Sequence, residues 1–261
     1  MVKRGGGYSV ERRRIWVLVG LLMLAASLWT AQLGLEQAVP VDGAAPETEV
    51  EAPSSAPQTG GLLALTFDDG PRRSTTTALL DGLAQRGVHA TFFLVGQRVE
   101  NGLEDLVLRM EQEGHQIGIH TYDHTAALTG LSAADFDAQV GRTRRLLTSI
   151  LGRSDFALRP PYGAVDAAVR ANAGGPIVLW SVDPEDWNTE DAAAVAQHLV
   201  SHAKDGDILL LHDLFPSSVE AALQAVDALH EKGFYFVTVE DLLAARHITP
   251  ENGVSYRCAY P

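Results

Sequence analysis

From residue 62 onward, short apolar runs alternate with longer amphipathic segments, and this alternation constrains the fold more than any other feature. The runs are continuously apolar, which is typical of strands that are buried on both faces of a parallel sheet. They cover residues 62–67, 90–95, 116–119, 156–158, 177–181, 207–211 and 234–239. Helix-like segments separate them at 75–86, 103–113, 132–151, 190–203 and 217–232. The pattern predicts an α/β fold, and its seven runs favour a distorted (β/α) barrel of parallel strands over an open sheet.

Polar and ionisable residues follow five of the predicted strands at the points where the strands end. In α/β barrels the active site is built from the loops at the carboxyl ends of the strands. Five such ends on one face would bring these side chains together, so the sequence predicts an enzyme. The residues are Asp68, Asp69, His120, His124, Arg159, Asp183, Asp186, Trp187, His212 and Asp213.

His120 and His124 have a spacing that suits two ligands of one metal. Four residues apart, two imidazoles lie on the same side of a helical turn. The pattern alone is weak, because nine histidines make such pairs common and two surface histidines would look the same. A nearby carboxylate strengthens the metal interpretation, since two histidines and one carboxylate form a known open catalytic zinc site.

Asp68 and Asp69 can supply that carboxylate. Adjacent residues of a strand point to opposite faces, so both reach one site only if the strand ends there. Gly70 and Pro71 provide the break. One carboxylate can then bind a metal while the other accepts a proton from water. A turn capped by an aspartate is the alternative explanation for the same residues.

Arg159 and His212 are ambiguous when taken alone. The guanidinium of Arg159 can hold a carboxylate in a fixed orientation, although a solvent-facing arginine before a proline turn is the simpler explanation. His212 ends a buried run. Beside a carboxylate its pKa would rise and it could act as a general acid, whereas a lone histidine is more often structural.

The charge distribution excludes some partners. The chain carries 20 Lys+Arg and 33 Asp+Glu, a formal charge of −13. Five of the basic residues lie in the first 14 positions with one glutamate, so the other 247 residues hold 15 basic and 32 acidic side chains. A domain this acidic repels phosphate backbones, and we expect no nucleic-acid binding. The single cysteine, Cys258, allows no internal disulfide and no cysteine-based zinc cluster.

The N-terminal part predicts export. Residues 1–14 form a basic tail, and residues 15–35 form an uncharged, mostly apolar run that is long enough to cross a membrane. The positive-inside rule keeps the basic tail cytoplasmic and exports the rest. We expect a membrane anchor and a location at the cell membrane, with a cleaved signal peptide and secretion as the alternative. Residues 36–60 are rich in Pro, Ala, Glu, Ser and Gly, which predicts a disordered linker.

Five short motifs resemble those of the polysaccharide deacetylases with a NodB homology domain, which form carbohydrate esterase family four. They are TFDDG at 66–70, HTxxH at 120–124, RxPYG at 159–163, DxxDW at 183–187 and LxH at 210–212. The resemblance covers roughly residues 61–245 and implies a NodB-like barrel. We place the polysaccharide deacetylase domain at 61–248 and a C-terminal tail at 249–261. One departure is Ile119, which stands before the first histidine where the family often has an asparagine.

The resemblance implies a metal site and a general base. Asp69, His120 and His124 would bind a divalent metal, with zinc as the expected ion and cobalt or another divalent ion as alternatives. Asp68 would be the general base that activates water, and Arg159 would orient it.

The resemblance also implies how the substrate is held and released. His212, paired with Asp186, would protonate the departing amine. The backbone N–H of Tyr162 would stabilise the oxyanion, and Trp187 and Leu210 would wall the pocket for the acetyl methyl group.

The implied function is metal-dependent removal of N-acetyl groups from an extracytoplasmic N-acetylglucosamine polymer, peptidoglycan above all, with release of acetate. Alternatives within this class are a chitin or exopolysaccharide deacetylase and an acetylxylan esterase. An inactive glycan-binding protein is an alternative from another class, but decay normally removes a ligand or the acid, and none is missing. We expect a monomer whose partners are a glycan and, through its N-terminal segment, the membrane.

Overall fold

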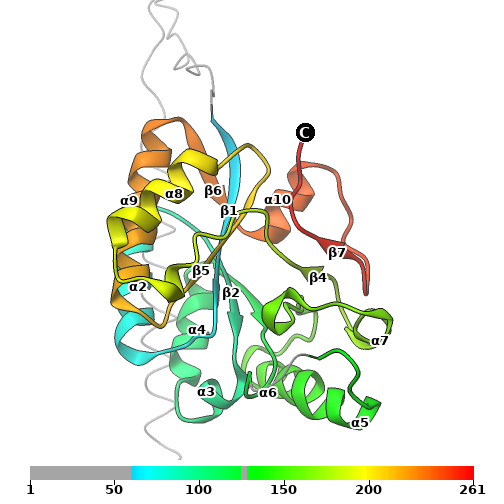
Figure 1. The fold of residues 1–261 in the computed structure, drawn as a ribbon. Helices are drawn as coiled ribbons and strands as arrows, with labels where there is room; N and C mark the ends of the chain where they lie inside the picture. The colour runs from blue at the N-terminus through cyan, green and yellow to red at the C-terminus, as the bar shows by residue number, and fades with distance from the viewer. Residues whose placement is uncertain (1–59, 125–127) are drawn as a thin grey trace, which may run out of the picture. The chain divides into compact units, whose positions relative to one another are not determined.

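The computed structural model describes residues 60–124 and 128–261 (Figure 1). Its main sheet is parallel, with the strand order β3-β2-β1-β5 and with β6 also paired to β1. The α/β fold with a parallel sheet that the sequence predicts is therefore confirmed. The strands are β1 (Gly61–Asp68), β2 (Thr91–Leu94), β3 (Gln116–Ile119), β4 (Ile177–Val178), β5 (Ile208–His212), β6 (Phe234–Val237) and β7 (Ser255–Tyr256).

The central strand, β1, takes a different neighbour at each end. Its residues 61–64 pair with β6, and its residues 64–68 pair with β5. Six of its eight residues are buried, which explains why its sequence is continuously apolar rather than alternating. This double pairing fixes the position of Asp68, the last residue of the strand.

Isolated β-bridges connect β3 to β5 by way of the segment that lies between them in the sequence and contains β4. Parallel pairing therefore runs from β1 through β2, β3 and the β4 segment to β5, and from β5 back to β1. The run predicted as a strand at 156–158 forms only one bridge residue, because the proline pair that follows lacks the N–H groups that a ladder needs. The bridges join Ile119 to Leu158, Leu158 to Ile177, and Val182 to Leu209.

Helices cover the sheet, and Figure 1 shows α2, α8 and α9 stacked together beside β1 and β5. Helix α2 ends at Gly87, whose φ of 62° gives a left-handed cap. The segment predicted as one helix at 132–151 contains a π-helical turn between α5 and α6. The helices are α2 (Arg73–Arg86), α3 (Gly96–Glu100), α4 (Glu104–Gln112), α5 (Ala133–Phe136), α6 (Arg142–Leu151), α7 (Ala167–Asn172), α8 (Ala192–His202), α9 (Pro216–Glu231) and α10 (Val239–Ala245).

The segment 249–261, which we expected to be a tail, pairs with the rest of the domain. Strand β7 runs parallel to β4. The backbone of Cys258 forms an isolated antiparallel β-bridge with that of Asp207, just before β5. The described residues accordingly belong to one compact unit. The sequence does not reveal this pairing, because a strand of two residues is too short to show a period.

A Gly206→Ala variant tests how closely the C-terminal segment packs. Gly206 has a φ of 95°, and a Cβ there would lie 2.3 Å from the backbone oxygen of Ala259. We expect the free energy of unfolding to fall by about 3 kcal/mol through backbone strain and overpacking. Gly152→Ala is the matched control, since Gly152 has a φ of 72° with open space around it, and should lose only about 1 kcal/mol. Urea denaturation measures both losses, and equal values would contradict the close packing.

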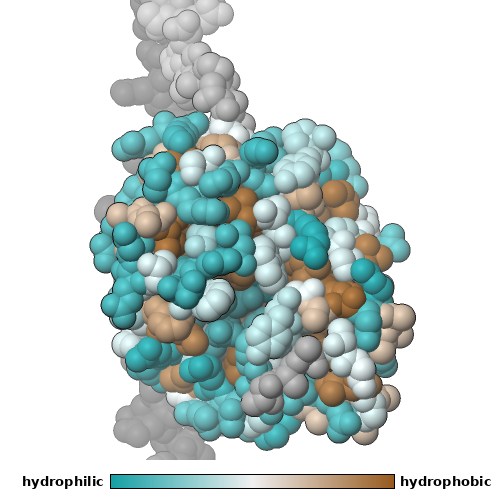
Figure 2. Space-filling view, viewed as in Figure 1, coloured by the Kyte–Doolittle hydropathy of each residue, from teal (hydrophilic) through white to brown (hydrophobic). Residues whose placement is uncertain are grey.

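The predicted basic tail, the apolar run at 15–35 and the linker up to residue 59 lie outside the described residues. No helix in the described ranges is long and apolar enough to cross a bilayer. The face of the domain seen in Figure 2 is mostly hydrophilic, and its apolar patches are small and separate.

Candidate active site

The ends of the parallel strands bring the predicted residues together. Asp68 ends β1 and His212 ends β5, and the two are direct partners in the strand register. The backbone N–H of His120 donates to the carbonyl of Leu94 at 2.9 Å, and that of Arg159 donates to the carbonyl of the last residue of β3 at 2.9 Å. The sheet ladder therefore continues into the site and positions these residues.

Three predicted site residues have left-handed backbone conformations. The φ angle is 71° at Asp69, 56° at His124 and 60° at Tyr162. Such conformations cost non-glycine residues energy and are concentrated at functional sites. At Asp69 the left-handed turn follows directly on β1, so Asp68 and Asp69 both lie near the same imidazole, within 3.7 and 3.4 Å of its Nε2. This is the strand break that the sequence predicts.

His120 and His124 lie close together, but not on a helix. The segment that joins them is an irregular turn in which Thr121 has a φ of 65°. The two ring centroids are 4.8 Å apart. The spacing predicts their proximity correctly, whereas the helical turn is wrong, because left-handed residues replace the helical backbone.

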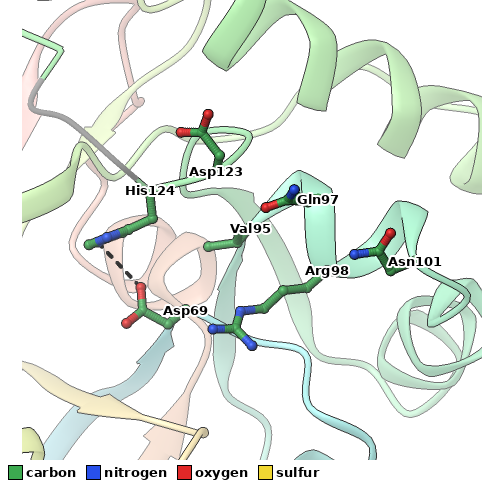
Figure 3. Close-up of a pocket in the computed structure, with 7 residues that line it drawn as sticks. All are labelled: Asp69, Val95, Gln97, Arg98, Asn101, Asp123 and His124. Carbon is green, nitrogen blue, oxygen red and sulfur yellow. Dashed lines mark ion pairs between the residues drawn. The ribbon is translucent and has the colours of Figure 1, made fainter.

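Asp69, His120 and His124 form a cluster whose geometry suits a metal ion. One potential ligand atom from each lies within 4.8 Å of the others. Asp69 Oδ1 lies 3.4 Å from Nε2 of both histidines, and it is buried without a hydrogen-bond partner. Figure 3 shows the side chains of Asp69 and His124 pointing toward one another. A buried carboxylate oxygen that faces two imidazole nitrogens fits a cation better than it fits water.

A hydrogen bond on the far side of the ring fixes the tautomer of His120. Its Nδ1 lies 2.6 Å from the carbonyl oxygen of Arg159, to which a protonated nitrogen donates. Burial lowers the pKa of His120 despite the nearby Asp68 and Asp69, so the ring is neutral at pH 7. Its Nε2 therefore presents a lone pair toward Asp69, as a metal ligand must.

Arg159 is fully buried and holds Asp68 from behind. Its Nη1 donates to Asp68 Oδ1 at 2.8 Å and to Thr66 Oγ1 at 2.7 Å. Its Nε and Nη2 donate to backbone carbonyls at the end of β4 at 3.1 and 3.0 Å. The other oxygen of Asp68, Oδ2, is left facing His120 Nε2 at 3.7 Å. The alternative of a solvent-facing arginine is therefore wrong.

His212, at the end of β5, forms a pair with Asp186. His212 Nδ1 lies 2.8 Å from Asp186 Oδ1, and the backbone N–H of His212 donates to Oδ2 at 2.9 Å. Burial acts to lower the pKa of His212, but Asp186, with smaller contributions from Asp68 and Asp69, raises it to about 9. The ring is therefore protonated at pH 7, and its Nε2 is the nitrogen able to give up a proton.

The raised pKa of His212 predicts a pH-dependent stability. Protonation stabilises the fold because the pKa is about 9 in the folded protein and 6.5 in the unfolded chain. The contribution is fully present below pH 6.5 and is lost as the pH rises through 9. In chelator, we expect the wild type to lose up to about 3 kcal/mol over this range relative to His212→Gln. Urea denaturation at several pH values measures the loss, and parallel curves for the two proteins would contradict it.

Of the three residues expected at the substrate pocket, two are exposed and one is buried. Tyr162 is 70% exposed, and its ring packs against that of His124 at 5.3 Å between centroids. Trp187 is 56% exposed and borders a cavity of about 690 Å³ together with Asp186. Leu210 is buried within β5. Two aromatic rings are thus available to a polymer at the surface, while Leu210 belongs to the wall of the sheet.

Sequence reasoning missed two parts of the site. Thr66 is the first residue of the TFDDG motif, but the sequence alone assigns it no role; it supports Arg159 and donates to the carbonyl of Leu209 at 2.7 Å. Arg98 lines a cavity of about 390 Å³ beside the metal cluster. Nothing in the sequence marks Arg98, because its place depends on how α3, the helix that follows β2, lies relative to the end of β1.

Comparisons with known proteins support the same family as the motifs. The polysaccharide deacetylase family model matches residues 55–174. The chain is 37% identical to the peptidoglycan-N-acetylmuramic acid deacetylase PdaC of Bacillus subtilis, over 69% of this chain and 38% of that protein. It is 35% identical to a peptidoglycan-N-acetylglucosamine deacetylase of Bacillus cereus, over 73% of this chain and 92% of that protein. A family 4 acetyl xylan esterase from Clostridium thermocellum, solved with a cobalt ion, superposes with a TM-score of 0.71 at 29% identity, over 76% of this chain and 98% of that chain.

The chain spans 38–39% of the length of the first curated relatives that it matches, so those relatives contain much that this chain does not align with. The Bacillus cereus relative, by contrast, is matched over nearly its whole length. The resemblance that the five motifs indicated is confirmed, and the chain belongs to the polysaccharide deacetylase family.

Proposed function

We propose that this chain is a metal-dependent deacetylase that hydrolyses N-acetyl groups of an N-acetylglucosamine-containing polysaccharide, most of all peptidoglycan, and releases acetate. The observation that carries the proposal is the cluster of Asp69, His120 and His124 with Asp68 and His212 beside it. Three metal ligands flanked by a proton acceptor and a proton donor are the groups that hydrolysis of an amide requires.

The expected metal is zinc, with cobalt or another divalent ion as alternatives. Two imidazole nitrogens and one carboxylate oxygen are a typical open zinc site, and the unpartnered Oδ1 of Asp69 is the atom that such an ion would satisfy. When bound, the ion would lower the pKa of a water molecule and polarise the acetyl carbonyl.

Asp68 is the proton acceptor in this proposal. Arg159 holds its Oδ1, so the oxygen that can take a proton from the attacking water is Oδ2, which faces the metal ligands. Because Arg159 is fixed by Thr66 and two backbone carbonyls, the carboxylate is held in one orientation before substrate arrives.

His212 is the proton donor. As the bond between the acetyl carbon and the nitrogen breaks, Nε2 of His212 gives its proton to the departing amine, and Asp186 keeps the ring oriented. The backbone N–H of Tyr162 would stabilise the negative charge that develops on the carbonyl oxygen. Trp187 and Leu210 would enclose the acetyl methyl group. The products are acetate and a free amino sugar.

The likeness to an acetyl xylan esterase favours ester hydrolysis as the second candidate. The two reactions differ in the leaving group. An amine leaves only after its nitrogen is protonated, and His212, which Asp186 orients at 2.8 Å, is placed to supply that proton. The paired His212 therefore supports amide substrates over esters. Chitin and exopolysaccharides share the same N-acetyl chemistry and remain alternatives to peptidoglycan.

Acetate release by the purified protein tests the proposal. The substrates are N-acetylglucosamine oligomers, peptidoglycan and acetylated xylan, each assayed with zinc, with cobalt and after chelation. We expect metal-dependent release from the first two, faster than from xylan. Faster release from xylan would favour the esterase, and tight zinc binding without release from any glycan would favour a binding protein.

We further propose that residues 15–35 anchor the domain outside the cytoplasmic membrane and that residues 36–60 act as a linker. The basic residues before the apolar run support this orientation. Cell fractionation of the full chain tests it, with a chain that lacks residues 1–35 as the control. Release of a shortened protein into the medium would indicate a cleaved signal peptide instead.

A further inference from the structure

The segment that carries both histidine ligands contains strained backbone. We call residues 120–124 the histidine turn. Within it, the φ angle is 65° at Thr121 and 56° at His124. Residues other than glycine pay an energetic cost in this conformation, so such a turn persists only where the surrounding structure holds it. The contacts around the histidine turn therefore decide which conformation it keeps.

The two histidines of the turn are held in different ways. The backbone N–H of His120 continues the sheet ladder after β3, and its ring nitrogen Nδ1 lies 2.6 Å from the carbonyl oxygen of Arg159. His124 comes four residues later, at the other end of the turn. Its backbone N–H donates to Thr121 Oγ1 at 3.2 Å, which is a contact within the turn itself. The position of His124 relative to His120 thus depends on what fixes the backbone between them.

The carbonyl groups of the turn are bonded to the beginnings of two helices. At the start of α3, the N–H of Gly96 donates to the carbonyl of Thr121 at 3.0 Å, and that of Gln97 donates to the carbonyl of Tyr122 at 2.7 Å. The hydroxyl of Thr143, near the start of α6, lies 3.0 Å from the carbonyl oxygen of Thr121. Helices α3 and α6 lie side by side (Figure 1). The histidine turn is therefore bonded to both of them through its carbonyls.

The N–H groups in the middle of the turn share one acceptor, the side chain of Gln139. Its Oε1 accepts from the backbone N–H of Tyr122 at 3.0 Å and from that of Asp123 at 3.3 Å. Because both groups are donors, only the oxygen of the amide can face them. The hydroxyl of Thr143 lies 2.9 Å from the backbone oxygen of Gln139, so the same hydroxyl contacts both the acceptor residue and the turn.

Gln139 lies at the centre of the π-helical turn Asp137–Gly141, which joins α5 to α6. Its side chain is half-buried. Single π-helical turns within helices are frequent at functional sites, where they change the direction in which a side chain points. Here the π-helical turn faces the strained backbone between two metal ligands. That placement gives the irregular helix a function that the five motifs do not include.

We propose that Gln139 is a positioning residue for the metal site. By accepting two backbone N–H groups in the middle of the histidine turn, it fixes the position of His124 relative to His120 and thereby the affinity and the geometry of the site. This inference rests on the metal site of the proposed function. It requires an oxygen at the end of the side chain rather than an amide nitrogen, so glutamate can replace Gln139 and alanine cannot.

Zinc affinity and the spectrum of the cobalt form test the proposal. Gln139→Ala removes the acceptor of two N–H groups, and we expect the affinity for zinc to fall by about ten- to a hundredfold. Gln139→Glu keeps an oxygen that accepts both, and should retain most of the affinity. Competition with a chelating dye measures the affinity. At saturating cobalt, the visible absorption bands should change in Gln139→Ala and not in Gln139→Glu, which a loss of stability alone would not produce.

Gln224→Ala is the matched control. Gln224 is an exposed glutamine of α9 whose amide donates to Glu220 at 3.0 Å, and its replacement should leave zinc affinity and cobalt absorption unchanged. Circular dichroism of all four proteins verifies that they are folded. Equal losses of affinity in Gln139→Ala and Gln139→Glu would overturn the positioning role.

Zinc binding by the wild type separates this inference from the proposed function. A wild type that binds no zinc would overturn the metal site, and this inference with it. If the wild type binds zinc tightly and Gln139→Ala matches it in affinity and in cobalt absorption, the positioning role of Gln139 is overturned while the metal site and the deacetylase function stand.

Discussion

An Asp68→Asn variant is expected to keep its metal and to lose about two to four orders of magnitude in kcat. An amide cannot accept the proton that Asp68 Oδ2 is placed to take, 3.7 Å from Nε2 of His120. The asparagine oxygen can still accept the hydrogen bond from Arg159 Nη1, so the geometry of the site changes little. The loss should therefore appear in kcat with little change in KM, because the group acts on the transition state more than on binding.

The measurement pairs saturating acetate-release kinetics with a zinc titration of the same protein. Asp137→Asn is the matched control, since Asp137 is an exposed carboxylate that is bonded to Arg145 and belongs to none of the five motifs. Asp68 is the carboxylate that pairs with the buried Arg159, so circular dichroism must show that the variant is folded. A kcat within tenfold of the wild type would contradict the role of Asp68 as base. A matching loss of zinc affinity would identify it as a ligand instead.

The position of the site could be predicted because it depends on strand ends. Continuous apolar runs mark buried parallel strands, and the polar residue after each run must lie at the same end of the sheet. Asp68 and His212 show why this works, since they end two neighbouring strands and face each other in the register. The order of the five motifs then limited the family to one.

The features that the sequence analysis got wrong or missed depend on local backbone conformation or on contacts between segments that are distant in the sequence. The helical turn at the two histidines could not be excluded from spacing, because left-handed residues such as Thr121 give a different turn with the same separation. The strand at 255–256 has no period, and it forms only because β4 presents an edge to it. Arg98 has no motif at all. It lines the same pocket as Asp69 because α3, on which it lies, comes close to the turn that follows β1.

Spacing alone also gives a false match, which supplies a control for the metal site. His198 and His202 have the same separation as His120 and His124, and their rings stack 4.2 Å apart on α8. Within the described ranges, however, only the earlier pair has a carboxylate that completes a cluster, Asp69. The third ligand, not the spacing, distinguishes a metal site from two neighbouring histidines.

His124→Gln is therefore expected to lower the affinity for zinc by at least about a hundredfold and to abolish metal-dependent acetate release. The side chain of His124 is 26% exposed, so its replacement should leave the fold intact and isolate the effect on the metal. Competition with a chelating dye measures zinc affinity, and visible absorption of the cobalt form reports the ligand set directly. His202→Gln should leave both unchanged. If His202→Gln instead weakened zinc binding as much as His124→Gln, the metal would lie on α8, and the charge of Asp69 would need another partner.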